Sequence, residues 1–313
     1  MSKSVLDAKA LHDEASAYAW IEARLWPNGP ICPHCGGAER ISKMKGKSTR
    51  IGAYKCYHCR KPFTVKIGTI FEDSHVPMRF WVQAIYLMCA SKKGVSANQL
   101  HRTLGVTLKT AWFISHRIRE AMRPSGPETI RGGGLVPLGG EGCVVEADET
   151  FIGRWEGSIK RRGHGHKNTV LSLVDRNSKK VRSFHVHGVS AATIIPIVIE
   201  NVVEETAMMT DEGGAYATLG EYFASHESVS HKAYEWVRDD VHTNTVEGYF
   251  SIFKRGMKGV YQHCSEKHLH RYVAEFDFRY NNRIRLGIDD VERTELAVKG
   301  AIGKRLTYQT SRH

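Results

Sequence analysis

The chain has 313 residues, of which 41% are hydrophobic and 25% charged, values that are ordinary for a globular protein of two or three domains. Its first 26 residues have neither the apolar core nor the cleavage pattern of a signal peptide, and the longest apolar run, residues 80–90, is too short to span a bilayer. The composition therefore excludes a membrane protein, and we expect a cytoplasmic one. Seven cysteines, an odd number with two CxxC pairs, indicate metal binding and not a disulfide framework.

The net charge of +12 is concentrated in the first part of the chain. Residues 1–130 contain 20 Lys and Arg against 9 Asp and Glu, whereas residues 131–313 contain 25 against 24. Such asymmetry predicts a polyanion-binding part joined to a nearly neutral part. Nucleic acid is the first candidate for the partner, and an acidic membrane surface is the second.

Two CxxC pairs follow an amphipathic helix that is predicted over residues 5–25. The pairs are separated by 20 residues and consist of Cys32, Cys35, Cys56 and Cys59. Each pair directs two thiolates toward one centre, so two pairs complete the tetrahedral ligand set of a structural zinc ion. The sequence therefore predicts a zinc ribbon with one zinc ion. A redox pair and a chance cluster of cysteines are the alternatives.

The segment after the ribbon is predicted to be mainly helical. We expect a strand over residues 63–71, a helix from about Pro77, and two helices joined at Gly105 within residues 96–122. The second of these two helices would present side chains to bases and phosphates in a major groove. These side chains are Lys109, Thr110, Arg117 and Arg119. A helical hairpin with a solvated basic face is the alternative.

Residues 124–142 are rich in Gly and Pro without periodicity, which indicates a linker and the main domain boundary. Beyond the linker, the patterns predict a mixed sheet covered by helices, an α/β (α+β) fold. The expected strands cover residues 144–153, 169–175, 181–189 and 207–212, and the expected helices cover residues 190–203, 243–257 and 267–283.

The strand predicted over residues 144–153 holds carboxylates that are unusual in a buried strand. Asp148 lies in this strand, Asp211 ends a later apolar run, and Glu247 lies on an apolar helix. A few carboxylates from separate elements bind Mg2+ together with water, and two such ions support phosphodiester chemistry. We therefore interpret these three acids as ligands of two Mg2+ or Mn2+ ions. Taken singly, each could instead be a cap or a solvated charge.

Basic residues accompany the acids. Lys254 lies seven residues after Glu247, so both project from nearly the same helix face, where Lys254 could meet a DNA phosphate. Arg255 follows Lys254, and Arg161 and Arg162 lie in a basic loop punctuated by glycines. The loop either binds a DNA strand or is simply solvated.

The sequence resembles the ISXO-type group of insertion-sequence transposases, which have a zinc ribbon and an RNase H-like catalytic core. The resemblance covers roughly residues 15–285 and rests on CPHCGG, CYHCRKPFTVKIGTIFEDSHVP, SKKGVSANQLHRTLGVTLKTAWFISHRIREAM, ADETFIG, TDEGGAY and HTNTVEGYFSIFKRG. It implies an RNase H-like fold, Mg2+ dependence, and strand cleavage with strand transfer at the ends of a mobile element. It also implies a prokaryotic, nucleoid-associated homo-oligomer on double-stranded DNA, bound to terminal inverted repeats and to target DNA.

Asp148, Asp211, Glu247 and Lys254 match the DDE(K) signature of this group, and Asn244 is a second candidate for the third metal position. Two other functions stay open, a non-catalytic zinc-ribbon regulator that binds DNA and a stand-alone RNase H-like nuclease. The expected parts of the chain are the N-terminal helix with the ribbon (1–75), a helix-turn-helix-like DNA-binding region (76–123), the linker (124–142), the catalytic domain (143–290) and a C-terminal tail (291–313).

Overall fold

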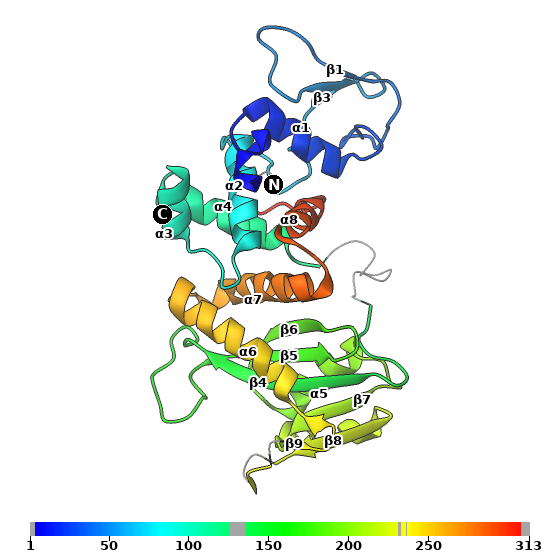
Figure 1. The fold of residues 1–313 in the computed structure, drawn as a ribbon, viewed down its shortest axis with the longest axis vertical. Coiled ribbons are helices and arrows are strands. Elements are labelled where there is room, and N and C mark those ends of the chain that lie inside the picture. The colour runs from blue at the N-terminus through cyan, green and yellow to red at the C-terminus, as the bar shows by residue number, and fades with distance from the viewer. Residues whose placement is uncertain (1–3, 125–135, 231–232, 236, 308–313) are drawn as a thin grey trace. The chain divides into compact units, whose positions relative to one another are not determined.

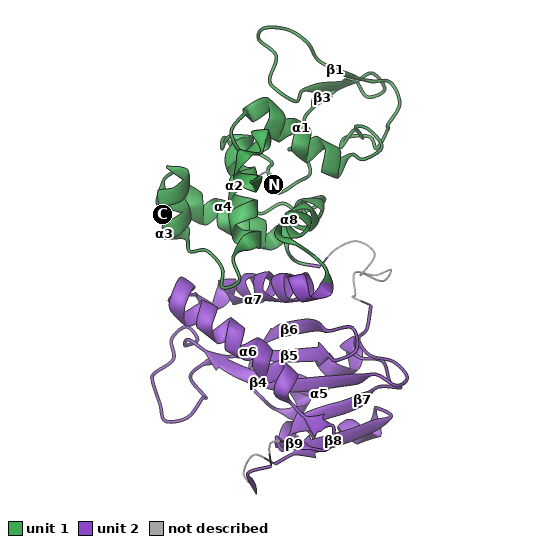
Figure 2. Cartoon of the chain, viewed as in Figure 1, with its two compact units in different colours: residues 1–123, 287–313 green, residues 124–286 purple. Residues whose placement is uncertain are grey.

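A computed structural model of the protein describes residues 4–124, 136–230, 233–235 and 237–307. Most of the predicted linker over residues 124–142 lies outside the described residues. The chain forms two compact units, one of residues 1–123 with 287–313 and one of residues 124–286 (Figure 1 and Figure 2). In the described part, no helix is long and apolar enough to cross a membrane.

The first unit combines a cysteine-bearing ribbon with a group of helices. The ribbon is an antiparallel sheet of β1 (Ile41–Lys43), β2 (Tyr54–Cys56) and β3 (Pro62–Phe63). The helices are α1 (Glu14–Leu25), α2 (Met78–Ala90), α3 (Ala97–Leu104), α4 (Leu108–Ala121) and α8 (Asp290–Lys299). Gly105 ends α3 in a left-handed conformation, φ 66°, which confirms the two predicted helices with a glycine turn.

Two predicted elements of this unit are shorter than expected. The helix predicted over residues 5–25 begins one residue after Asp13, because the Asp13 carboxylate caps it there; the residues before it form short 3-10 turns. The strand predicted over residues 63–71 ends at Phe63, because the chain turns and Gly68 adopts a positive φ of 72°.

The predicted C-terminal tail contains a helix that the sequence analysis missed. Residues 291–299 form most of α8, whose first turn is closed by a capping box between Asp289 and Glu292. Ala297 and Val298 of this helix are buried in the first unit. Residues 290–299 are therefore part of a folded unit and not of an unstructured tail.

The second unit is built on a five-stranded mixed sheet in the order β6-β5-β4-β7-β8. The strands are β4 (Val144–Ile152), β5 (Asn168–Asp175), β6 (Lys180–Val186), β7 (Ala207–Asp211) and β8 (Ser225–Val229). β4, β5 and β6 are antiparallel neighbours, whereas β7 is parallel to β4 and β8 to β7. This is the strand order of the RNase H-like fold, so the predicted fold class is confirmed. A small hairpin, β9 (Val237–Arg238) and β10 (Val241–His242), follows.

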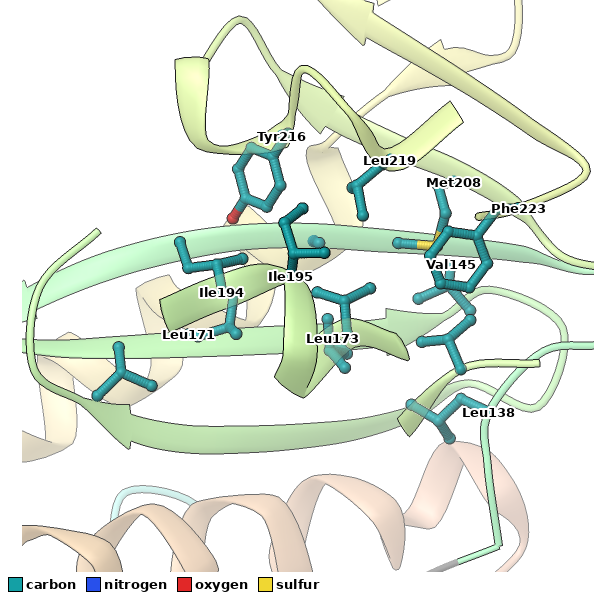
Figure 3. Close-up of a cluster of buried hydrophobic side chains, with 14 residues drawn as sticks. Leu138, Val145, Leu171, Leu173, Ile194, Ile195, Met208, Tyr216, Leu219 and Phe223 are labelled. Carbon is teal, nitrogen blue, oxygen red and sulfur yellow. The ribbon is translucent and has the colours of Figure 1, made fainter. Parts of the chain in front are cut away.

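Helices cover both faces of this sheet. On one face, Ile194 of α5 (Ala191–Asn201) and Val145 of β4 belong to one buried apolar cluster (Figure 3). Val198 of α5 and Ala147 of β4 are members of the same cluster. On the other face lie α6 (Asn244–Gly256), a π-helical turn (Met257–Tyr261) and α7 (Glu266–Asn281), packed over Ile152 and the even-numbered positions of β5. Alternate residues of β4 therefore face opposite layers, and its even-numbered residues face α6.

A buried hydrogen-bond cluster joins α7 to the sheet. Asp277 of α7 accepts hydrogen bonds from the Ser183 N–H (2.8 Å) and hydroxyl (2.8 Å) in β6, and from the Tyr249 hydroxyl (2.5 Å) in α6. Burial nevertheless raises the pKa of Asp277 to about 6. The carboxyl group is therefore held in a place that favours its protonated form.

We expect Asp277→Asn to change the pH dependence of stability. Because the folded pKa of about 6 lies above the unperturbed 3.8, the stabilising contribution of this group is complete below 3.8 and is lost as the pH rises through 6. From about pH 4 to about pH 8, the parent should lose up to about 3 kcal/mol of unfolding free energy through this residue, and the variant should not. Urea unfolding of both proteins across this range measures the difference. Parallel pH profiles would contradict the expectation.

Candidate functional site

The four cysteines of the ribbon converge on one point. Cys32 and Cys35 lie in the loop after α1, Cys56 ends β2, and Cys59 lies in the turn before β3. Their sulfur atoms all lie within 4.8 Å of one another, with 3.6 Å between Cys32 and Cys59 and 3.7 Å between Cys35 and Cys56. Within the described ranges, this is the one group of three or more candidate metal ligands with such spacing.

These distances fit a tetrahedral zinc ion. With Zn–S bonds of about 2.3 Å, the sulfurs of a tetrahedron lie roughly 3.8 Å apart. Backbone amides of Cys59 and His58 lower the pKa of the Cys56 thiol to about 7, which favours the thiolate that a metal requires. Four cysteines complete the coordination of such an ion, so the geometry is that of a structural site without an open position.

In the second unit, the strand register brings Asp148 level with Asp211. β4 and β7 are parallel, and Glu146 of β4 pairs with Met209 of β7. Two residues further along both strands, Asp148 stands opposite Asp211, the last residue of β7. Residues at equivalent positions of paired strands point to the same face, so both carboxylates project toward the layer that contains α6.

The carboxyl group of Asp148 lies where its charge is disfavoured. Burial raises its pKa to about 8, and the charges of Asp211, Glu149 and Glu247 add to the rise. Burial also raises the pKa of Glu149, on the opposite face of β4, to about 7. The carboxylate oxygens of Asp148, Asp211 and Glu247 are further apart than the four sulfurs, since they do not all lie within 4.8 Å of one another. Asp211 and Glu247 are nevertheless near enough to Asp148 to disfavour its charge, and a cation beside Asp148 would favour its ionised form.

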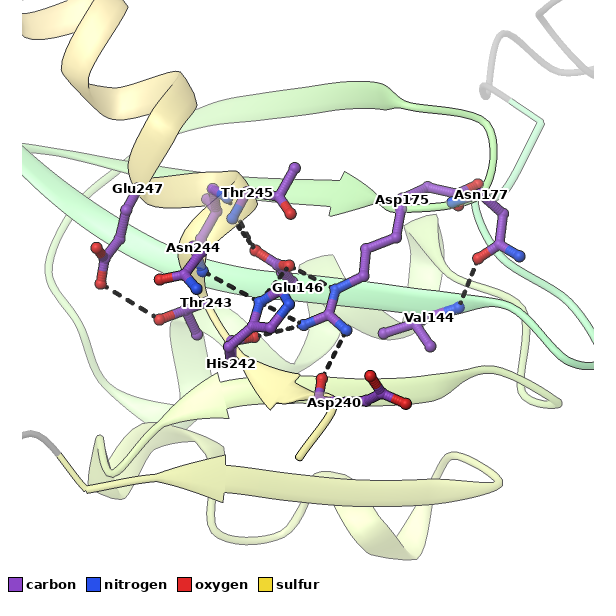
Figure 4. Close-up of polar contacts among 12 residues, drawn as sticks. Val144, Glu146, Asp175, Asn177, Asp240, His242, Thr243, Asn244, Thr245 and Glu247 are labelled. Atoms are coloured by element: carbon purple, nitrogen blue, oxygen red, sulfur yellow. Dashed lines mark hydrogen bonds and ion pairs between the residues drawn. The ribbon is translucent and has the colours of Figure 1, made fainter. Parts of the chain in front are cut away.

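Helix α6 presents two predicted site residues in its first turn. Asn244 is the first residue of α6, and Glu247 follows three positions later, so both lie on one exposed side of the helix (Figure 4). The Thr243 hydroxyl donates to the Glu247 carboxylate at 3.4 Å. The charge of Glu247 reaches Asp148, whose pKa it helps to raise. Two strands and one helix therefore bring the three predicted acids together.

Two family models match the chain. The ISXO2-like transposase domain matches residues 137–281, and the transposase zinc-ribbon domain matches residues 12–62. Residues 137–281 belong to the family of ISXO2-like transposase domains, and residues 12–62 to that of transposase zinc ribbons. The first match spans the mixed sheet, α6, α7 and the three acids, and the second spans the four cysteines. The family predicted from the sequence is confirmed.

Two other comparisons relate this transposase to known proteins. An uncharacterized protein in transposable element ISH50 of Halobacterium salinarum is 28% identical over 270 residues, which are 81% of this chain and 86% of that protein. Among solved structures, the simian T-cell lymphotropic virus intasome in complex with the PP2A regulatory subunit B56 gamma is 13% identical, with a TM-score of 0.28 over 57% of this chain and 63% of that chain.

The basic residues predicted for the transposase domain lie in two places. Lys254 is half-buried in the last turn of α6, with its Nζ 5.9 Å from the centre of the Phe250 ring. Arg255 is exposed and donates hydrogen bonds within its own helix. Arg161 and Arg162 are exposed in the loop between β4 and β5. Their contacts with DNA stay a prediction.

Of the four DNA-facing residues predicted on α4, two are accessible. Lys109 is exposed and Thr110 half-buried, both in the first turn of the helix. Arg117 and Arg119 are only 3% and 1% exposed. The Arg117 guanidinium donates to backbone carbonyl oxygens of the segment before α2, and Arg119 donates to the Ser115 hydroxyl. Arg117 therefore joins α4 to that segment, and Arg119 is buried with a bond inside α4. We correct the expectation that these two arginines face DNA.

Two features beside the acids were not assigned from the sequence. The Gly213 N–H donates to Asp211 Oδ1 at 2.9 Å, and a Cβ at Gly213 would lie 2.8 Å from that oxygen. The first glycine of TDEGGAY thus leaves room for the carboxylate, and its place two residues after an acid is the signal for it. Glu146 is fully buried and contacts the start of α6. From the sequence, Glu146 is recognisable as an unusual carboxylate in a buried strand, but the groups that bind it are not.

We expect the purified protein to contain about one zinc ion per chain, and Cys35→Ser to lose it, because three thiolates leave the tetrahedral set incomplete. Elemental analysis of the dialysed proteins measures the zinc content. Cys143→Ser changes a half-buried cysteine of the other unit and should retain the metal. Full zinc content in Cys35→Ser would show that the four thiols do not act as one ligand set.

We expect Gly213→Ala to weaken Mn2+ binding at the acid cluster about tenfold or more, because the new methyl group displaces the Asp211 carboxylate. Gly214→Ala is the matched control, since a Cβ at Gly214 meets nothing within 4 Å. Titration of the zinc-loaded proteins with Mn2+, followed by the electron paramagnetic resonance of free Mn2+, compares them. Equal affinities for both alanine variants would refute this role of Gly213.

Proposed function

We propose that this transposase catalyses metal-dependent strand cleavage at the ends of a mobile element and transfers the cut strand to target DNA. The observation that carries the proposal is the convergence of Asp148, Asp211 and Glu247 on one face of the sheet, where burial and neighbouring charge disfavour an ionised Asp148. Groups with strongly shifted pKa values gather at functional sites, and a cation bound at this place would offset the repulsion. Membership in the transposase family supports DNA as the substrate.

In this proposal, Asp148, Asp211 and Glu247 hold two Mg2+ or Mn2+ ions. Such ions, when bound, supply activation of an attacking hydroxyl group and stabilisation of the leaving oxygen of a phosphodiester. Asp148 and Asp211 approach from neighbouring strands, and Glu247 approaches from α6. Asn244 is the alternative third ligand. The electrostatic effect of Glu247 on Asp148 favours Glu247.

Other residues of the catalytic part bind the DNA. Lys254 lies two helical turns after Glu247 and near the same side of α6, so its ammonium group would contact a phosphate next to the metals. Arg255 and the loop residues Arg161 and Arg162 would contact the backbone further away. These side chains are exposed or half-buried, which leaves them accessible to a strand.

The DNA-binding part is assigned to the zinc ribbon, within residues 1–75, and to α3 and α4, within residues 76–123; catalysis is assigned to residues 143–290. Lys109 and Thr110 at the start of α4 would reach DNA, as first-turn residues of a recognition helix do. The excess of basic residues within residues 1–130 supports this assignment. The partners are terminal inverted repeats and target DNA at the nucleoid, bound by a homo-oligomer.

We expect Asp148→Asn to abolish Mg2+- or Mn2+-dependent cleavage of element-end DNA and to leave DNA affinity unchanged, because the amide has the shape of the carboxylate but not its charge. Single-turnover cleavage and a binding titration at one salt concentration measure the two properties. Glu227→Gln, an exposed acid on β8, is the control and should cleave like the parent.

The products separate this function from two others. Joined target DNA in addition to cut ends supports a transposase, whereas cut ends alone would indicate a nuclease of the same fold. Specific binding without cleavage by the parent would indicate a regulator. Cleavage by Asp148→Asn at the parental rate would remove the catalytic assignment.

A further inference from the structure

Glu146 lies two residues before Asp148 on β4 and is fully buried. An ionised carboxylate in such a place is costly unless charges and hydrogen bonds compensate it. The proposed chemistry gives this residue no part, because its oxygens are already engaged. The partners of those oxygens indicate what Glu146 does.

The two oxygens of Glu146 have different partners (Figure 4). Oε1 accepts a hydrogen bond from Arg176 Nε at 2.6 Å and lies 3.3 Å from His242 Nδ1. Oε2 accepts from two backbone groups, the N–H of Thr245 at 2.9 Å and the N–H of Val246 at 2.8 Å. The Glu146 side chain on the central strand thus binds both the Arg176 guanidinium and the first turn of α6.

The start of α6 depends on this contact from outside the helix. Backbone N–H groups in a first turn have no partner within their own helix. Thr243, at the N-cap position, makes no side-chain bond to them. The Glu146 carboxylate takes that place, and its negative charge is also favoured by the dipole at a helix N-terminus.

Arg176 fixes the chain just before the helix. Its guanidinium donates to the carbonyl oxygen of Asp240 at 2.8 Å and to that of His242 at 2.7 Å. Together with the bond to Glu146, these contacts hold residues 240–246 against β4. The entry into α6 is therefore anchored on both sides of its first residue.

We propose that Glu146 is a positioning residue of the active site, which ties the first turn of α6 to β4 and so sets where Glu247 stands relative to Asp148. Glu247 follows Val246 directly in the chain. Glu146 and Asp148 project from the same face of β4, roughly 7 Å apart along the strand. The strand that carries one metal ligand thereby also places the helix that carries another. The inference rests on the proposed function, because it takes Glu247 as a metal ligand.

The test uses the zinc-loaded full chain with three substitutions. Glu146→Leu removes both acceptor oxygens, and Glu146→Gln keeps one oxygen that can still accept from the α6 amides. Glu275→Gln is the matched control, because Glu275 is equally buried and pairs with Arg279 inside α7, away from the start of α6. Hydrogen exchange of the peptide that contains residues 242–248 reports the amides of Thr245 and Val246. Titration with Mn2+, followed by its resonance, reports the acid cluster without requiring activity.

We expect Glu146→Leu to speed exchange of these two amides and to weaken Mn2+ binding about tenfold or more, the usual effect of removing a group that orients a metal ligand. Glu146→Gln should show smaller changes in the same direction, and Glu275→Gln neither change. Parental Mn2+ affinity in both Glu146 variants would overturn the inference, even if their stability fell as far as that of Glu275→Gln. If Glu146→Leu does not fold, Glu146→Gln decides by the same two readouts.

Failure of the proposed function would look different. In that case the parent and Asp148→Asn would bind Mn2+ alike, so the acid cluster would not be the metal site. Faster exchange of the α6 amides in the Glu146 variants together with parental Mn2+ affinity, in a protein whose Asp148→Asn variant loses Mn2+, would leave the function intact and refute the positioning role alone.

Discussion

Placing several carboxyl groups on one face of a sheet costs free energy, because each loses hydration and each feels the charge of the others. Strand β4 carries two such groups, Glu146 and Asp148, on the same face. Glu146 is compensated by the Arg176 guanidinium and by two helix amides. Asp148 has one backbone N–H, that of Glu149 at 2.6 Å, and its pKa rises to about 8. The fold thus compensates the charge of Glu146, whereas the charge of Asp148 stays disfavoured; we propose that a metal ion compensates it.

The strand that bears these groups can hold them still because both of its faces are packed. Val145 and Ala147 are buried against the α5 layer, and Ile152 is buried against α6 and α7. Helix α6 is in turn fixed by Val246 and other apolar side chains of its inner side, while Glu247 remains on its exposed side. The metal site that we propose requires ligands whose positions do not relax away from one another under repulsion. Tight packing on both sides of β4 supplies that resistance.

The sequence was sufficient where the signal is local. The CxxC spacing predicted the cysteine cluster, and the glycine between two helical patterns predicted α3 and α4. It was insufficient where the outcome depends on distant partners. Arg117 has the spacing of a surface residue on α4, yet it is buried because carbonyl groups far along the chain accept its hydrogen bonds. Glu146 and Asp148 are alike in sequence, and only the partners of Glu146, 30 to 100 residues away, distinguish them. Charge counting cannot reveal such pairings.

Contacts between distant residues also explain why the distribution of charge along the sequence predicts only one of the two boundaries between the units. The basic part, residues 1–130, ends near the first boundary, but the first unit also contains residues 287–313. Arg293 of α8 donates to the Cys89 carbonyl at 2.9 Å, and Arg117 donates to the Leu306 carbonyl at 3.1 Å. Both bonds join the N-terminal helices to residues that follow the second unit in the sequence. The second unit is therefore an insertion in the sequence of the first unit, whose last segment follows α6 and α7 in the chain.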